Sequence, residues 1–219
     1  MASELVNPAD RPTGYYENER GEMLRFIPDT TSTTLEFGCG IGRFSSLLKE
    51  TLHTESWGVE IDCQAAAQAA KRLDKVIASD AILALKDIPN GFFDCVIFFD
   101  VLEHLVDPYS LLNGIKEKMT EKGIIVASIP NISYYRTMVD LVIRGNWDYK
   151  SHGVLDKSHL RFFTRNSIVK TFDELDFDIA AIEGMHATSS RSFKILNALL
   201  IGRLKDLRYK HYTVVAKPR

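Results

Sequence analysis

Short apolar runs alternate with amphipathic stretches along most of the chain. The apolar runs predict strands at Thr33–Phe37, Ser56–Ile61, Val76–Ala78, Phe92–Phe99 and Gly123–Ile129. The stretches between them predict helices at Ile41–Thr51, Gln64–Leu73 and Tyr109–Met119, and a weak one near Ala81–Leu85. This regular alternation implies an α/β fold, a mostly parallel sheet with helices on both faces. Continuous apolar strands such as CVIFF fit a sheet that is buried on both sides.

The two ends of the chain depart from this alternation. Residues 1–30 form an N-terminal segment in which the pattern of Tyr15–Ile27 predicts a helix. Residues 131–165 carry aromatics, arginines and histidines with little periodicity, which predicts a cap or substrate-binding insertion after the fifth strand. Beyond the cap we expect a helix at Arg165–Leu175, a strand at Phe177–Ile182 and a final strand in HYTVVAKP. The last two strands are expected to pair as an antiparallel hairpin around a helical excursion.

Composition narrows the class of protein. At 219 residues the chain suits one domain, residues 1–219. Its net charge of -2 gives no bulk positive field for a phosphate backbone, so nonspecific nucleic-acid binding is not expected. Three cysteines without CxxC spacing indicate neither a disulfide framework nor a structural zinc site, which fits a reducing cytoplasm. Because no apolar stretch is long enough to span a bilayer, we expect a cytoplasmic protein without stable membrane insertion.

The richest motif is LEFGCGIGRF, in which a strand carrying Glu36 runs into Gly38, Gly40 and Gly42. Glycines at alternate positions let the backbone turn sharply and approach a ligand closely. The spacing is GxGxG, whereas a dinucleotide-binding loop is usually GxGxxG. Arg43 stands at the third position of that dinucleotide pattern. The preceding acid adds a group that could hold a cationic amine.

Polar residues also follow the other predicted strands. In an open parallel sheet the ligand lies beyond the carboxyl ends of the strands, so these residues belong together. Glu60 ends the second strand about twenty residues after the glycines, the distance at which an acid accepts the hydroxyls of a ribose. After the third strand, Asp80 could accept a hydrogen bond from an adenine amino group, and Ala81 offers a backbone donor. The fourth strand leads into DVLEHLVDP.

These four groups of residues at the strand ends, in this order, resemble those of the class I S-adenosylmethionine-dependent methyltransferases, and the resemblance runs from about residue 15 to residue 219. The resemblance implies a Rossmann-like seven-stranded sheet of order 3-2-1-4-5-7-6 whose last strand is antiparallel. It implies that the first two glycines line the methionine moiety, that Glu36 orients the loop and the amino group, and that Arg20 pairs with the methionine carboxylate. The implied cofactor set is Arg20, Glu36, Gly38, Gly40, Gly42, Glu60, Ile61, Asp80, Ala81 and Phe99.

The second half resembles a narrower bacterial and archaeal subgroup. SIPN after the fifth strand and then GNWDYKSHGVLDKSHLRFFT carry this resemblance. Many members of the subgroup are linked to surface polysaccharide or related sugar metabolism. The resemblance therefore implies a small-molecule or glycan acceptor that is methylated on oxygen, with polysaccharide biosynthesis as the setting.

His104 is one of two candidate catalytic residues. Methyl transfer is an in-line displacement that depends mainly on alignment, and a base helps only when the acceptor must lose a proton. An imidazole just past the fourth strand could take that proton near neutral pH. The alternative is that His104 starts a helix and is satisfied by local hydrogen bonds. Asp107 before Pro108 is interpreted as an N-cap.

The cap supplies the other candidates. His159, the second candidate catalytic residue, alternates with Arg161, so in an extended segment both face the same side and could bind the acceptor together with Asp156. The alternative is a structural brace in which Asp156 pairs with Arg161 and the following phenylalanines enter the core. Trp147 and Tyr149 could stack on a sugar ring, although we expect at least one of them to anchor the cap.

Two further patterns are ambiguous. Asp100, Glu103 and His104 resemble a cluster that binds a divalent ion in a few methyltransferases, with His159 as a possible fourth ligand. Relatives without metal also carry LEH there, so we expect no metal. Residues 191–205 combine bulky apolar and basic side chains that could touch a membrane or a lipid-linked acceptor. We favour a helix that closes over the sheet or makes a homodimer contact.

Three functions therefore compete. The first is an enzyme that uses S-adenosylmethionine to O-methylate a small molecule or glycan precursor. A noncatalytic module that keeps the cofactor pocket for regulation is the second. An NAD-dependent oxidoreductase is the third, and Arg43 argues against it. Nucleic-acid methylation is a lesser alternative, because DVLEH lacks a base-holding motif and no basic stripe is evident.

Overall fold

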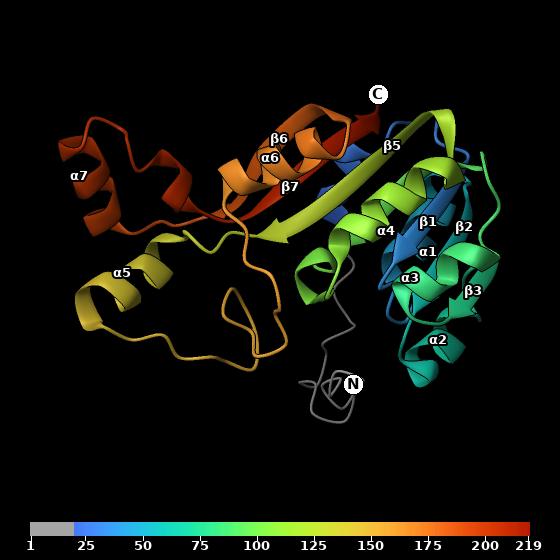
Figure 1. Cartoon of the computed structure of the whole chain (residues 1–219), viewed down its shortest axis with the longest axis horizontal. Helices are drawn as coiled ribbons and strands as arrows, with labels where there is room; N and C mark the ends of the chain where they lie inside the picture. The colour runs from blue at the N-terminus through green and yellow to red at the C-terminus, as the bar shows by residue number, and fades with distance from the viewer. Residues whose placement is uncertain (1–19) are drawn as a thin grey trace.

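The computed structural model describes residues 20–219 and shows one seven-stranded sheet of order β3-β2-β1-β4-β5-β7-β6 (Figure 1). The strands are β1 (Thr33–Phe37), β2 (Glu55–Glu60), β3 (Lys75–Ala78), β4 (Phe93–Phe99), β5 (Met119–Pro130), β6 (Phe177–Ala187) and β7 (Tyr209–Pro218). Strands β1 to β5 pair in parallel, whereas β7 runs antiparallel to both β5 and β6. The expected Rossmann-like fold, strand order and antiparallel last strand are confirmed.

Helices connect the strands and cover both faces of the sheet. The α-helices are α1 (Arg43–Leu52), α2 (Cys63–Ala69), α3 (Ala81–Ala84), α4 (Pro108–Ile115), α5 (Tyr135–Arg144), α6 (Arg165–Glu174) and α7 (Arg191–Leu199). The 3-10 helices are η2 (Gly21–Phe26), η3 (Leu85–Asp87), η4 (Leu102–His104), η5 (Lys116–Lys118) and η6 (Lys205–Arg208). Asp107 accepts a hydrogen bond from Ser110 N–H and precedes Pro108 at the start of α4, so the predicted N-cap is confirmed.

Alternation along β4 explains how the sheet is buried on both sides. Val96 and Phe98 face the larger apolar cluster, where α3, α4 and α6 pack. Ile97 and Phe99 face the opposite layer, which η2 and α1 cover. The carboxyl ends of these parallel strands converge on one edge, and the residues that follow them are therefore brought together.

Three predictions about the elements need correction. Of the predicted helix at 15–27, residues 15–19 lie outside the described residues, and the remainder forms the 3-10 helix η2 rather than an α-helix. Within the expected cap, residues 135–144 form the helix α5, which the sequence reading treated as irregular. Strand β6 extends to Ala187, five residues beyond its predicted end.

Helices α5 and α7 lie near each other beyond the carboxyl end of β5 (Figure 1). The rings of Tyr135 and Phe193 join them, with centroids 5.0 Å apart. Phe193 is buried, but Ile195 and Leu199 of α7 are exposed and α7 lies away from the sheet (Figure 1), so it does not close over the sheet, whereas the alternative of a homodimer contact stays a prediction. Among residues 20–219, no helix has both the length and the apolar character required to cross a membrane.

Candidate functional site

The glycine loop after β1 is held in a conformation that favours glycine. The φ angles of Gly38, Gly40 and Gly42 are 65°, 55° and 79°, all in the left-handed region. A Cβ atom on Gly38 would lie only 2.7 Å from Cγ2 of Val101. Gly38 N–H donates to the carbonyl of Val59 at 2.8 Å, which fixes the loop against the end of β2. The loop is therefore shaped so that its backbone is presented to a ligand.

Glu60 at the end of β2 fixes the middle of this loop. Its side chain is buried, and its Oε2 accepts a hydrogen bond from Gly40 N–H at 2.8 Å. Its Oε1 accepts one from Asp62 N–H at 2.9 Å. A carboxylate has about four acceptor sites, so Glu60 keeps capacity for two hydroxyl groups. Ile61, the next residue, is 41% exposed at this edge.

Glu36 is buried one strand away and holds the start of α1. Its Oε2 accepts a hydrogen bond from Ser45 Oγ at 2.5 Å. Burial raises the pKa of Glu36 to about 7, so its carboxyl group is partly protonated near neutral pH in the absence of a cation. A bound ammonium group would favour the ionised form.

Asp80 takes the position of an N-cap. Its Oδ1 accepts hydrogen bonds from the N–H groups of Ile82 and Leu83 at 2.9 and 3.2 Å, which starts α3. Asp80 and Ala81 are half-buried at the same edge as Glu60, since Ser79 N–H donates to the Glu60 carbonyl. The capping bonds occupy Oδ1, and the predicted contact of Asp80 with an adenine ring stays a prediction.

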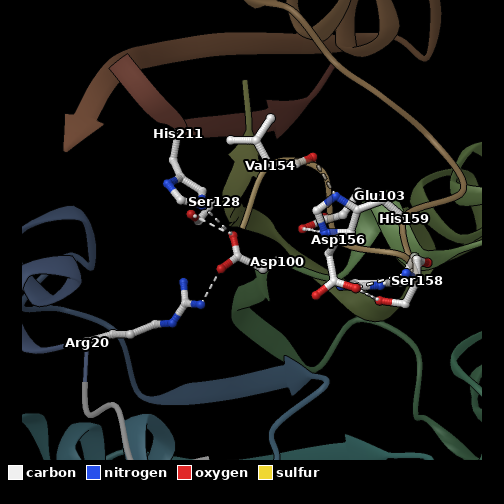
Figure 2. Close-up of polar contacts among 10 residues, drawn as sticks. Arg20, Asp100, Glu103, Ser128, Val154, Asp156, Ser158, His159 and His211 are labelled. Carbon is white, nitrogen blue, oxygen red and sulfur yellow. Dashed lines mark hydrogen bonds and ion pairs between the residues drawn. The ribbon is translucent and has the colours of Figure 1, made fainter. Parts of the chain in front are cut away.

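Asp100 joins the ends of the chain to the middle of the sheet (Figure 2). Its carboxylate forms an ion pair with Arg20, whose guanidinium lies 5.4 Å from the centre of the Phe99 ring. Asp100 has a φ of 53°, an unusual conformation for a residue other than glycine and one that is concentrated at functional sites. Burial is the largest influence and opposes ionisation of Asp100, but the charge of Arg20, the nearby His211 and the hydrogen bonds from Arg20 and Ser128 together outweigh it, so the pKa lies below the ordinary value.

His211 is a site residue that the sequence reading missed. It lies at the start of β7, paired in register with Pro130 at the carboxyl end of β5, and its Nε2 is 3.8 Å from Asp100 Oδ1. Ser128 Oγ also donates to this oxygen at 3.2 Å. Burial lowers the pKa of His211 to about 4, so the ring is neutral near pH 7. The signal was available, because an antiparallel strand begins at the edge where its parallel neighbours end.

Both predicted catalytic histidines meet on the far side of Asp100. The rings of His104 and His159 are 4.7 Å apart between centroids. Glu103, which is 1% exposed, lies beside them, with Oε1 3.9 Å from Nε2 of His159. Burial lowers the pKa of both histidines, and the neighbouring His159 lowers that of His104 further. Two neutral imidazoles and the buried carboxyl group of Glu103 thus form a compact cluster. No catalytic role was predicted for Glu103 from the sequence.

The expected brace between Asp156 and Arg161 is replaced by separate contacts. Asp156 Oδ1 accepts hydrogen bonds from the N–H and hydroxyl of Ser158 at 2.8 and 2.6 Å. Arg161 donates instead to the carbonyl of Val106. Phe163 is buried, as that alternative required, but Phe162 is 36% exposed. Asp156 shapes the turn that carries His159, and Arg161 ties the cap to the loop before α4.

Trp147 and Tyr149 share Phe162 as a neighbour in the cap. Their ring centroids lie 5.8 and 6.5 Å from that of Phe162. Trp147 is half-buried and Tyr149 is 55% exposed. Trp147 therefore matches the expected anchor, whereas Tyr149 presents an aromatic face to solvent.

The carboxyl edge as a whole fits S-adenosylmethionine. The glycine loop leaves space that side chains would fill, Glu60 keeps acceptor capacity, and Glu36 is a buried acid suited to an amino group. Arg20 is a cation at the same edge. This donor set matches a ligand that carries a ribose, an ammonium group and a carboxylate.

Comparisons with known proteins agree with this reading. Residues 15–182 match the family model described as "Methyltransferase domain". Over 102 residues, 47% of this chain, the sequence is 29% identical to a probable S-adenosylmethionine-dependent methyltransferase of Mycobacterium tuberculosis. That match covers 37% of the relative's own length.

Solved structures share the fold. One is a SAM-dependent methyltransferase from Archaeoglobus fulgidus, with a TM-score of 0.68 and 23% identity, covering 92% of this chain and 94% of that chain. Another, from Thermotoga maritima, is titled a possible histamine N-methyltransferase, with a TM-score of 0.64 and 16% identity, covering 93% and 89% of the two chains. The family match covers most of the sequence, and the sheet has the strand order that the motifs predict. The chain therefore belongs to the methyltransferase domain family, within the class I S-adenosylmethionine-dependent methyltransferases.

Proposed function

We propose that this protein transfers a methyl group from S-adenosylmethionine to an oxygen of a small molecule or sugar-containing precursor. The observation that carries the proposal is the cluster of His104, His159 and Glu103 beside Asp100, at the edge where the cofactor-binding residues converge. When bound, the cofactor supplies an electrophilic methyl group on a sulfonium. The chain's own residues must then align an acceptor with that methyl group and remove a proton from it.

The cofactor half of the site acts by positioning. In this proposal Glu60 holds the ribose hydroxyls, Gly38 and Gly40 let the methionine moiety approach the backbone, and Glu36 faces the amino group. Arg20 holds the carboxylate and is itself held by Asp100. Since Glu60 and Glu36 are already held by hydrogen bonds and Arg20 by its ion pair, little ordering of these side chains is required when the cofactor binds.

The acceptor half removes the proton. Because burial keeps the pKa of His104 and His159 low, both rings are neutral near pH 7 and can accept a proton from an acceptor hydroxyl. The C–O bond then forms as the C–S bond breaks, and the electron pair stays on sulfur. The exposed face of Tyr149, beside the ring of Phe162 that also contacts Trp147, is suited to stacking on a sugar ring.

The free cysteines fit the cytoplasmic setting that we propose. Cys39 and Cys95 are buried and Cys63 is exposed, and all three are unbridged thiols. Cys39 packs among Ala69 and Leu73, and burial raises the pKa of its thiol. A space-filling role for Cys39 follows, and a reducing compartment preserves the exposed thiol of Cys63.

Calorimetry and an acceptor screen test the proposal together. Wild-type protein should bind S-adenosylmethionine, and Glu60→Ala should weaken that binding about 100-fold or more. Glu55→Ala, on the same strand but at its opposite end, is the matched control and should bind normally. A panel of nucleotide sugars and phenolic hydroxyl compounds is then screened for formation of S-adenosylhomocysteine.

The outcomes separate the competing functions. Turnover with a hydroxyl acceptor supports the proposal. Cofactor binding without turnover of any acceptor supports a noncatalytic S-adenosylmethionine module. Binding of NAD in place of S-adenosylmethionine would indicate an oxidoreductase and overturn the proposal.

A further inference from the structure

Glu103 presents a buried carboxylate whose oxygens have no hydrogen-bond partner. Among residues 20–219, neither Oε1 nor Oε2 of Glu103 receives a hydrogen bond, although the side chain is 1% exposed. Its backbone carbonyl, by contrast, accepts the N–H groups of Leu160 and Arg161 at 2.8 and 3.0 Å. The backbone of Glu103 thus ties η4 to the cap. Its carboxylate lacks the hydrogen-bond partners that a buried polar group requires.

The two neighbouring imidazoles are fixed in one tautomer. Nδ1 of His104 lies 3.3 Å from the carbonyl oxygen of Ser158, and Nδ1 of His159 lies 3.1 Å from that of Val154. A carbonyl oxygen only accepts, so each Nδ1 carries the proton and each Nε2 of a neutral ring keeps a lone pair. Metal-binding histidines are commonly oriented by such a bond to a backbone carbonyl.

We propose that Glu103, His104 and His159 form a binding site for a divalent transition-metal ion. One donor atom from each of the three residues lies within 4.8 Å of the others. Two imidazoles and one carboxylate are the protein ligands of many catalytic zinc sites, which leave further positions open. Zinc–ligand bonds of about 2.0–2.1 Å require the three donors to draw closer together on loading.

The structure changes the grouping that the sequence suggested. Asp100 was considered together with Glu103 and His104, and no metal was expected. The carboxylate of Asp100 is engaged by Arg20 and Ser128 instead, on the side away from the cap (Figure 2). His159, 56 residues beyond Glu103 in the sequence, takes the third place in the cluster.

The ion deepens the proposed function, on which this step rests. His104 is the member of the trio with accessible surface, so an acceptor would reach an open position of the ion past this side chain. A hydroxyl oxygen bound there becomes more acidic. Its O–H bond breaks and the proton passes to solvent, the C–O bond forms, and the C–S electron pair leaves with sulfur. With the ion bound, the two histidines hold it in place of the direct proton acceptance described for the ion-free site.

Metal uptake can be measured independently of methyl transfer. Full-length protein is stripped with a chelator and dialysed, and then titrated with Zn²⁺ or Co²⁺. We expect one ion per chain by elemental analysis, a rise in Tm with Zn²⁺, and visible Co²⁺ absorption typical of a site with nitrogen and oxygen ligands. Glu103→Gln and His159→Asn should each weaken binding at least about tenfold. His152→Asn changes an exposed histidine of the same cap and should bind the ion as the wild type does.

Two results would overturn the metal site. One is the absence of stoichiometric uptake by folded wild-type protein. The other is equal uptake by the wild type, Glu103→Gln and His159→Asn. Should either buried variant fail to fold by circular dichroism, His104→Ala, at the half-buried position, provides the same comparison. Normal S-adenosylmethionine binding without metal uptake rejects the metal site and keeps the proposed function. Metal uptake without S-adenosylmethionine binding keeps the metal site and rejects the proposed function.

Discussion

The cofactor half and the acceptor half of the carboxyl edge differ in how their polar groups are satisfied. Glu60 accepts two backbone N–H groups, and Glu36 accepts the hydroxyl of Ser45. Both carboxylate oxygens of Glu103, although equally buried, lack hydrogen-bond partners within residues 20–219. A carboxylate with hydrogen-bond partners holds the surrounding backbone in place. A buried carboxylate without such partners can accept a ligand from outside the chain. In the proposed function, the first half holds the cofactor and the second acts on the acceptor.

The largest expected effect comes from breaking the cofactor half at Gly38. Gly38→Val places a branched side chain at a φ of 65° and against Val101, so we expect loss of measurable S-adenosylmethionine binding and destabilisation by about 2–4 kcal/mol. Calorimetry and urea unfolding measure the two quantities. Gly91→Val has nearly the same φ, 63°, with nothing within 4 Å of the added Cβ. Equal losses of unfolding free energy in the two variants would show that backbone strain alone, and not the close packing of the glycine loop, is responsible for the destabilisation.

Next in size is the pH dependence that Glu36 contributes. Since burial raises its pKa from 4.5 to about 7, the folded protein holds a proton that the unfolded chain releases between these values. The contribution of Glu36 to stability is therefore greatest below pH 4.5 and is lost as the pH rises through about 7. Glu36→Gln removes this loss, so its stability relative to the wild type should increase by about 2–3 kcal/mol from pH 4.5 to pH 8.

Urea unfolding of cofactor-free protein at several pH values measures this difference. Ser45→Ala is an informative companion, because it removes the hydroxyl that donates to Glu36 and keeps the acid. A difference between Glu36→Gln and wild type that stays constant with pH would contradict a raised pKa.

A smaller effect is expected at Asp100, where the two halves meet. Asparagine tolerates the left-handed conformation, so Asp100→Asn removes the charge and keeps the backbone. We expect about tenfold weaker cofactor binding, because Arg20 loses the partner that orients it. A double-mutant cycle with Arg20→Met should give a coupling energy of about 1–2 kcal/mol in unfolding measurements. Additive effects in that cycle would mean that the ion pair does not link the halves.

The smallest effect is expected in the cap. Phe162→Ala removes the ring shared by Trp147 and Tyr149, and because Phe162 is 36% exposed, the loss of stability should be about 1 kcal/mol. In steady-state assays, KM for a sugar acceptor should rise while cofactor affinity changes less than about twofold. A substantial loss of cofactor affinity would show that the cap supports both halves of the site.

The same division explains what the sequence could predict. The glycine loop, Glu60 and Asp80 lie at the ends of their strands, so the strand positions predicted these residues. The family resemblance predicted the order of the strands in the sheet. Helix α5 was missed although its sequence carries the signal, since Tyr135, Met138, Val139 and Val142 have the i, i+3, i+4, i+7 spacing of an amphipathic helix. The pairing of Asp100 with Arg20, 80 residues away, and the approach of His159 to Glu103 depend on tertiary packing. Local patterns carry no information about such distant contacts.

The return of β7 has a consequence for how this protein is made. Arg20, Asp100 and His211 meet at one carboxylate, yet the chain between the first and the last of them includes nearly the whole fold. A ribosome that has completed only β1 to β5 has synthesised the glycine loop and both acids of the cofactor half, but not His211. The residues proposed to bind the cofactor are therefore synthesised well before β7, which lies between β5 and β6 and brings His211 to Asp100. The contact between His211 and Asp100 thus waits for long-range strand pairing, which is the slow step expected of such sheets.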